Sequence, residues 1–124
     1  WLGDAEDAGF GSAEPWLPVG AENAALAVDA QEADETSLLN FTRTMLALRK
    51  AHPALHHGAV TACEARGNLL VLEREADGKS LRLVANFGEE PIMLDGEGAG
   101  GIVLAINGAT ARELPAFAAL LVRA

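Results

Sequence analysis

The sequence predicts a mostly β chain, in which a long loop and one amphipathic helix precede a small antiparallel β-sandwich. Three observations support this fold class. Ser37–Pro53 has a helical hydrophobic pattern, the residues after it alternate as strands do, and Asp77-Gly78 separates two strand-like runs. We therefore expect one part at residues 1–57, with the loop and helix, and a second at residues 58–124, with the sandwich.

Residues 1–34 lack any sustained periodicity and are predicted to form a long ordered loop, punctuated by glycine and proline. Loops of this length are uncommon unless they serve a function or belong to a larger fold. One interpretation of Ala24–Val28 is a short apolar docking segment that leads into the helix. The side chains expected to anchor the loop by packing are Trp1, Phe10, Trp16 and Leu17.

The helix predicted over Ser37–Pro53 has a wide apolar arc. At about 100° per residue, half of the helical wheel is occupied by Leu38, Leu39, Phe41, Met45, Leu46 and Leu48. Asp34 suits the N-cap, Glu35 suits the first turn, and Pro53 ends the helix. Because a helix on an open surface needs a narrower apolar stripe, we expect this helix to be covered on more than one side.

Arg49 falls inside the apolar arc, about 20° from Leu38. One interpretation is that its aliphatic stem packs while its charged head reaches water. The interpretation that we prefer is a structural, partly buried arginine between the helix and the sandwich. Its planar fork of donors would then bind a carboxylate or main-chain carbonyls.

The strand-like part begins with a strand at Gly58–Ala65 and continues with a hairpin. The hairpin strands, Leu69–Ala76 and Lys79–Phe87, flank the two-residue turn Asp77-Gly78, which is the strongest short-range hairpin signal. Such a turn fixes the register, and here it places opposite charges across the strand pair, which is favourable. The residues predicted to face each other are Ala76 and Lys79, Arg74 and Leu81, Glu73 and Arg82, and Leu72 and Leu83.

Three later segments complete the predicted sandwich, namely Pro91–Leu94, Gly101–Ile106 and Phe117–Val122. The glycine-rich link at Gly96–Gly101 is interpreted as a flexible turn. It lacks the lysine and the serine or threonine of a phosphate-binding P-loop, and no helix follows it. The link therefore predicts no phosphate site.

Charge and cysteine content narrow the classes of partner. The chain has 124 residues and a net charge of −9; residues 1–36 hold no lysine or arginine, and residues 37–57 hold no acid. An acidic chain argues against a nucleic acid partner, and no apolar run reaches the ~18 residues of a membrane span. The single cysteine, Cys63, excludes a disulfide within the chain, and we expect it to be a small buried residue of a strand.

No motif in the sequence assembles catalytic, cofactor-binding or metal-ligating residues. His52, His56 and His57 cluster after the helix, but with one cysteine and no matching carboxylates they do not indicate a metal site. A retaining glycosidase needs two carboxyl groups about 5–5.5 Å apart. No carboxylate in this sequence has a polar setting at the end of a strand that would mark it as one of such a pair. We therefore predict no catalytic, cofactor or metal residues, and no cofactor, for this segment.

Several phrases of the sequence carry a resemblance to a known family. They are AGF at Ala8–Phe10, EPWLPV at Glu14–Val19, VDAQEAD at Val28–Asp34, SLLNFTRTMLALRKAHPAL at Ser37–Leu55 and LPAFAALLVRA at Leu114–Ala124. Together they resemble the distal part of α-glucosidases of glycoside hydrolase family 13, the α-amylase family. The resemblance is specific from Ala8 to Leu55 and weaker from Gly58 to Asn107. Glu35 departs from the pattern, since the family often has proline there.

The resemblance implies a (β/α)8 barrel followed by an all-β C-terminal domain. Trp1–Asp34 would be the loop after the eighth barrel strand, Ser37–His52 the last barrel helix, and Gly58–Ala124 the C-terminal domain. The family's nucleophilic aspartate, acid/base glutamate and stabilising aspartate match no position here, so we expect a non-catalytic part of a longer enzyme. Its partners would be the catalytic barrel of the same polypeptide and, for the parent enzyme, an oligosaccharide.

The alternative is a stand-alone carbohydrate-binding or interaction module without catalysis. A sugar platform usually needs exposed aromatic side chains, and the predicted sandwich offers only Phe87 and Phe117, both within apolar runs. The alternative is therefore the weaker hypothesis. The residues do not indicate which glycosidic linkage a parent enzyme prefers or whether it is a hydrolase or a transglycosylase. They do not indicate a cellular compartment either.

Overall fold

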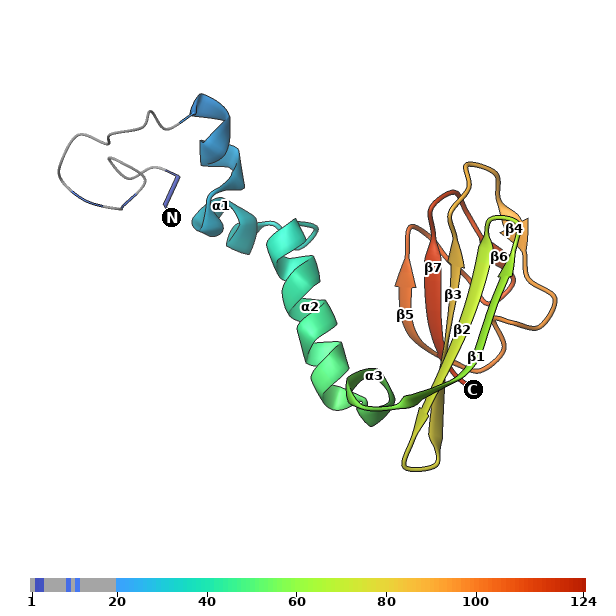
Figure 1. Cartoon of the computed structure of the whole chain (residues 1–124). Helices are drawn as coiled ribbons and strands as arrows, with labels where there is room; N and C mark the ends of the chain where they lie inside the picture. Colours follow the sequence, from blue (N-terminus) through green and yellow to red (C-terminus); the bar gives the residue numbers. More distant parts are fainter. Residues whose placement is uncertain (1, 4–8, 10, 12–19) are drawn as a thin grey trace. The chain divides into compact units, whose positions relative to one another are not determined.

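The chain forms two compact units, Trp1–Leu48 and Arg49–Ala124. The computed structural model of the chain (Figure 1) describes Leu2, Gly3, Gly9, Gly11 and residues 20–124. The predicted loop anchors lie outside the described residues, so their packing stays a prediction. They are Trp1, Phe10, Trp16 and Leu17. Among the described helices, none is long and apolar enough to cross a membrane.

The first unit is helical in its described part. A 3₁₀-helix, η2, covers Ala21–Leu26, and the α-helices α1 and α2 cover Val28–Ala33 and Leu38–Ala51, the last turn of α2 entering the second unit. α2 confirms the predicted helix. The prediction of a loop through residue 34 was wrong for its last part, because η2 and α1 are too short to leave a clear periodic signal in the sequence.

The N-cap of α2 is Ser37 and not the predicted Asp34. The Ser37 hydroxyl accepts a hydrogen bond from the N–H of Asn40 at 3.2 Å, and the Ser37 carbonyl accepts one from the N–H of Phe41 at 2.9 Å. Asp34 instead closes the turn before the helix, where its Oδ1 accepts from the N–H of Thr36 at 2.8 Å. Both side chains carry the oxygen that an N-cap requires, so residue type alone did not decide between them.

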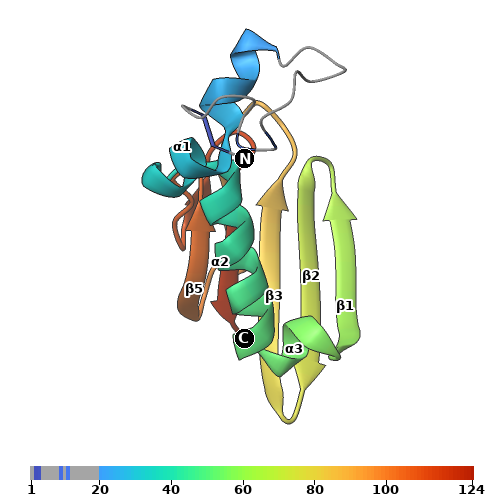
Figure 2. The ribbon, with the colours of Figure 1, turned by 90° about the vertical axis from the view of Figure 1, so that its left-hand side faces the viewer.

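The second unit consists of a short helix and antiparallel strands. Its elements are α3 Pro53–His56, β1 Ala59–Arg66, β2 Leu69–Ala76, β3 Lys79–Asn86, β4 Ile92–Met93, β5 Gly101–Ile106, β6 Glu113–Leu114 and β7 Ala119–Arg123. The larger sheet has the order β1-β2-β3-β7-β5, and β4 pairs with β6. α3 packs against β2 and β3 (Figure 2). The mostly β, antiparallel fold class is confirmed, although β6 was not predicted.

The hairpin of β2 and β3 has the predicted register. Asp77 and Gly78 form its turn with φ angles of 54° and 67°, the left-handed backbone that a type I′ turn needs at both positions. The observed partners include Ala76 and Lys79, Arg74 and Leu81, Glu73 and Arg82, and Leu72 and Leu83. The local signal in the sequence was therefore sufficient to place this pair of strands.

The hydrophobic core lies on one face of the larger sheet and includes the smaller sheet. Leu114 of β6 joins Val84, Leu120 and Val122, and all four are fully buried. Burial of each such side chain contributes about 1.5–3 kcal/mol. The register places Leu70, Leu72, Leu81 and Leu83 on the opposite face. Both faces are apolar in the sequence, and the position of the smaller sheet decides which one forms this core.

Three side chains expected within strands or apolar runs are exposed. Cys63 lies on β1 as predicted, but it is exposed because β1 is an edge strand with β2 as its neighbour. Phe87 and Phe117 lie just outside β3 and β7 and are 66% and 57% exposed. Phe117 has a φ of 52°, a left-handed conformation that a strand does not contain. The predicted strands were too long at these two ends.

Candidate functional site

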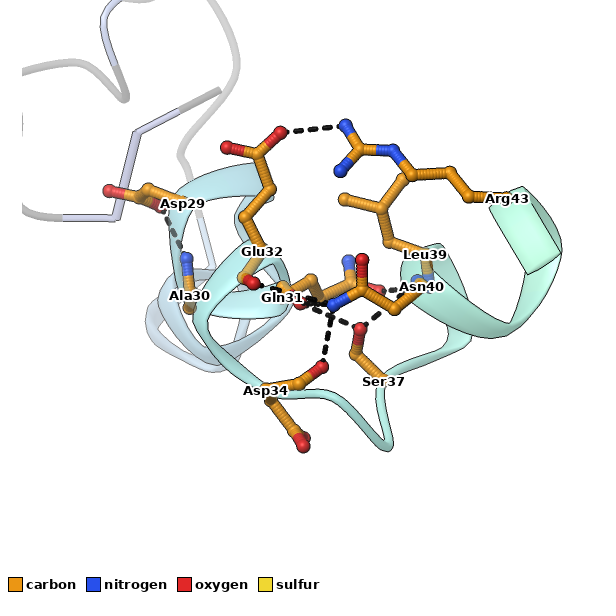
Figure 3. A network of polar contacts seen from close by, with 9 residues as sticks. All are labelled: Asp29, Ala30, Gln31, Glu32, Asp34, Ser37, Leu39, Asn40 and Arg43. Atoms are coloured by element: carbon orange, nitrogen blue, oxygen red, sulfur yellow. Dashed lines mark hydrogen bonds and ion pairs between the residues drawn. The ribbon is translucent and has the colours of Figure 1, made fainter.

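A polar network ties the end of α1 to the start of α2 (Figure 3). At its centre, Asn40 donates from Nδ2 to the main-chain carbonyls of Gln31 at 2.9 Å, Glu32 at 3.3 Å and Asp34 at 2.8 Å. The last carbonyls of a helix have no partner within that helix. The Asn40 side chain therefore caps the C-terminus of α1 from the first turn of α2.

Gln31 makes the reciprocal connection. Its Oε1 accepts from the N–H of Leu39 at 3.1 Å, and its main-chain carbonyl accepts from the hydroxyl of Ser37 at 2.7 Å (Figure 3). The Gln31 Nε2 also donates to the carbonyl of Leu26 at 2.6 Å. Each helix thus satisfies free main-chain groups of the other, so the network serves to fix the corner between them.

Two carboxylates near this corner are held as anions. Both oxygens of Asp29 accept from the N–H of Gly3, at 2.9 and 3.0 Å. This contact is the largest cause that lowers the pKa of Asp29. The pKa of Asp34 is also lowered, first by the hydroxyl of Thr36 and then by its N–H. Hydrogen bonds of this kind favour the charged form of a carboxyl group. Both carboxylates therefore act as charged hydrogen-bond acceptors.

A second charged cluster lies on the larger sheet next to the link between β4 and β5. Arg82 donates from Nε to Oε1 of Glu73 at 2.6 Å and from Nη1 to the carbonyl of Glu97 at 3.2 Å. Glu97 also pairs with Arg66 and accepts from the N–H of Asp95 at 2.7 Å. The pKa of Glu97 is lowered, first by its own main-chain N–H and then by Arg66. The cluster holds the link on the sheet.

Arg74, on β2, has the role that the sequence analysis gave to Arg49. Its Nη1 donates to the carbonyl of Leu55 at 3.2 Å and its Nη2 to the carbonyl of Gly58 at 2.7 Å, while its Nε is buried with no partner among the described residues. Arg49 is exposed, so the prediction that it is a partly buried structural arginine was wrong.

A signal for Arg74 was present in the sequence. The predicted hairpin register places this residue on the same face as four leucines, Leu70, Leu72, Leu81 and Leu83. A charged side chain on an apolar face needs a partner to compensate for lost hydration. Helical periodicity instead indicated Arg49. No residue of α2, Arg49 included, is buried.

The carboxylates of these clusters are not poised to donate a proton. A group that protonates a glycosidic oxygen requires a raised pKa, whereas the pKa values of Asp29, Asp34 and Glu97 are lowered. Of the predicted histidine cluster, His57 lies 4.0 Å from Asp77 and edge-on to the ring of His56. Within the described residues, no group of three or more histidine, cysteine, aspartate or glutamate side chains is placed to hold a metal ion. That this segment has no catalytic residue stays a prediction.

Comparison with known proteins gives matches along most of the chain. Residues 1–58 match the family model described as "Alpha amylase, catalytic domain". A probable alpha-glucosidase of Rhizobium meliloti strain 1021 is 40% identical over 84 residues, which are 68% of this chain and 15% of that protein. The trehalose synthase/amylase TreS of Mycobacterium tuberculosis is 36% identical over an alignment of 120 positions, which covers 77% of this chain and 20% of that protein.

Solved structures share the fold. The isomaltulose synthase from Klebsiella sp. LX3 superimposes with a TM-score of 0.76 over 98% of this chain and 24% of that one, at 23% sequence identity. The chain thus spans about a fifth or less of the length of the two curated relatives it matches. At 23% sequence identity, the superposition with the isomaltulose synthase shows a shared fold.

Proposed function

Because the chain belongs to the α-amylase family, glycoside hydrolase family 13, we propose that it is the distal part of a retaining α-glucosidase. The observation that carries this proposal is the 40% identity with the probable alpha-glucosidase of Rhizobium meliloti. The parent enzyme would act on α-glucosidic bonds of oligosaccharides through a covalent glucosyl intermediate. Residues 1–57 would end a (β/α)8 barrel, and residues 58–124 would form the C-terminal domain.

We further propose that this segment is structural and not catalytic. The carboxylates of Asp29, Asp34 and Glu97 accept hydrogen bonds from main-chain N–H groups, from a hydroxyl or from arginine. These contacts orient loops and hold the carboxylates ionised. A retaining mechanism needs one carboxylate to attack and one carboxylic acid to donate a proton, and the lowered pKa values of Asp29, Asp34 and Glu97 do not favour proton donation.

The exposed apolar side of α2 supports a structural role toward the rest of a larger protein. No residue of α2 is buried, and Leu38, Phe41 and Leu46 are 73%, 42% and 61% exposed. Contiguous apolar surface of this kind usually marks an interface. In our proposal the catalytic barrel of the same polypeptide covers this side, as the width of the apolar arc predicts.

An activity assay tests the proposal. The purified 124-residue chain is incubated with a chromogenic α-glucoside, alone and together with the separately expressed barrel segment of the parent enzyme. We expect no turnover above buffer from the chain alone and higher activity or thermal stability of the barrel when the chain is added. Turnover by the chain alone that disappears in Asp29→Asn, Asp34→Asn or Glu97→Gln would refute the structural role.

Matched variants of α2 test the interface separately. Leu46→Gln should weaken association with the barrel, measured by light scattering or sedimentation, because it replaces an exposed apolar side chain of the proposed contact. Thr44→Gln is the control, since Thr44 lies on the polar half of the helical wheel and is also exposed. Equal association of both variants would contradict the assignment of this face while leaving the catalytic question unaffected.

A second candidate function is a carbohydrate-binding module, and one observation favours it. Phe87 and Phe117 are both exposed. The N–H of Phe117 donates to the carbonyl of Gly88 at 3.2 Å, and this bond brings the main chain at Phe117 next to the residue that follows Phe87. Exposed aromatic rings can stack on sugars. Binding of a maltooligosaccharide by the chain alone, lost in Phe87→Ala and Phe117→Ala but kept in Phe41→Ala, would support this function; an absence of binding would remove it.

A further inference from the structure

We propose that a cavity in the second unit binds a small organic anion. The cavity has a volume of about 470 Å³ and is lined by the junction of α2 and α3, by the first residues of β3 and by the end of β7. This volume is within the range of small-molecule sites, about 300–1,000 Å³. Its apolar lining includes Pro53, Ala54 and Leu81, of which the last two are almost completely buried.

The charged side chains that line the cavity are basic, and the lining also includes Ser80 and the last residue, Ala124. Lys79, Arg123 and His52 contribute to it, and no aspartate or glutamate does, although the chain contains 18 acidic residues. Within the described residues none of these three side chains forms an ion pair, whereas Arg43, Arg66 and Arg82 each pair with a glutamate. A positively charged site on a strongly acidic protein therefore stands free for an anion.

The walls of the cavity are held in place by hydrogen bonds. Arg74 binds the carbonyls of Leu55 and Gly58 and so fixes α3 against the sheet. On the other side, the N–H of Ala124 donates to the carbonyl of Ser80 at 3.1 Å, which joins the end of β7 to β3. A site that is formed before the ligand arrives loses less free energy to ordering.

The two kinds of lining define the chemistry of the ligand. Lysine and arginine make charge-assisted hydrogen bonds with carboxylate or phosphate oxygens. The apolar residues between them favour a ligand with a compact hydrocarbon or aromatic body. The predicted ligand is thus an organic anion, in which one carboxylate or phosphate group is joined to an apolar body.

NMR titration of the full chain tests the proposal. Benzoate and phenyl phosphate are the anionic probes, benzyl alcohol is the neutral analogue of similar size, and inorganic phosphate lacks the apolar body. We expect saturable shifts at the amides of Lys79, Leu81 and Arg123 with both organic anions, weaker binding of benzyl alcohol and of phosphate, and a loss of affinity at high salt. The ratio of the benzoate and phenyl phosphate affinities identifies the preferred acid group.

Matched variants locate the bound anion. Lys79→Gln and Arg123→Gln should each weaken binding about fivefold or more, because a charge-assisted contact made by an exposed cation is lost. Lys50→Gln and Arg112→Gln remove equal charges outside the cavity lining and should change affinity less than twofold. Ala51→Phe, at an exposed lining position, should fill the cavity and abolish binding. Equal binding of benzyl alcohol, equal effects of all four charge variants, or no saturable shift would each overturn the proposal.

Discussion

Arg74 and Gly58 are joined by a hydrogen bond of 2.7 Å from the arginine Nη2 to the glycine carbonyl, although they lie 16 positions apart in the sequence. A second bond from Nη1 reaches the carbonyl of Leu55 at 3.2 Å. The planar guanidinium thus spans two acceptors at the end of α3 and the entry to β1. This contact attaches the short helix to the sheet.

We expect Arg74→Lys to lower the free energy of unfolding by about 1–3 kcal/mol, because one ammonium group cannot replace the fork at both carbonyls. Urea unfolding followed by circular dichroism measures the change. Arg49→Lys is the matched control and should stay within about 0.5 kcal/mol, since Arg49 is exposed. Equal effects of the two substitutions would contradict the role assigned to Arg74.

Gly58→Ala should also destabilise the second unit. A Cβ at this position would lie 2.5 Å from the carbonyl oxygen of Ala54 and 2.8 Å from that of Glu75. Both neighbours are main chain and cannot rotate away, so we expect a loss of about 1–3 kcal/mol from overpacking. Gly101→Ala is the control, because its nearest contact is the flexible end of Arg123 at 3.4 Å. A melting temperature of Gly58→Ala equal to that of the control would count against this close approach.

The pair of Glu73 and Arg82 should show measurable coupling in a double-mutant cycle. Their side chains are 25% and 24% exposed and meet at 2.6 Å, so we expect about 0.5–1 kcal/mol from Glu73→Gln and Arg82→Gln. Glu32 and Arg43 meet at the same distance but are 50% and 53% exposed. Solvent screens this second pair more strongly, and its coupling should be smaller. A larger coupling for the exposed pair would contradict this ranking.

Asn86→Asp should strongly destabilise the core of the second unit. The Asn86 side chain is buried, and its Nδ2 donates to the carbonyls of Glu90, Leu114 and Pro115. A carboxylate there would face three acceptors, so we expect a loss of about 3 kcal/mol or more at neutral pH. Asn107→Asp is the control at an exposed site with one such bond, to Phe117 at 2.8 Å. Unfolding curves that coincide for the two variants would rule out this role of Asn86.

Acid should release the link between β4 and β5 through Glu97. The pKa of Glu97 is lowered from its ordinary value of 4.5, so its contribution to stability is fully present above pH 4.5 and is lost as the pH falls through the lower, folded-state pKa. The amide of Asp95, which donates to Glu97 Oε2, should report this titration by NMR. Glu97→Gln should remove the transition, and an unchanged profile in that variant would assign it to another group.

The sequence by itself determined the elements whose partners lie close along the chain. Helical periodicity located α2, and the Asp77-Gly78 turn fixed the register of β2 and β3, including Glu73 opposite Arg82. In a hairpin the turn and the alternation of side chains constrain the same few residues, so local preferences and final structure agree. The predicted absence of catalytic residues rests on missing motifs and awaits the activity assay.

Tertiary structure decided what depends on contacts distant in sequence. The choice of Arg74 over Arg49 depends on α3 meeting β2, and the burial of Asn86 depends on Leu114, 28 positions away. The exposure of Cys63 follows from the position of β1 at the sheet edge. Both faces of the hairpin are apolar in sequence, and only the position of β6 selects the Val84 face for the core. Residue patterns state what a side chain can bind, whereas packing alone determines which partner it reaches.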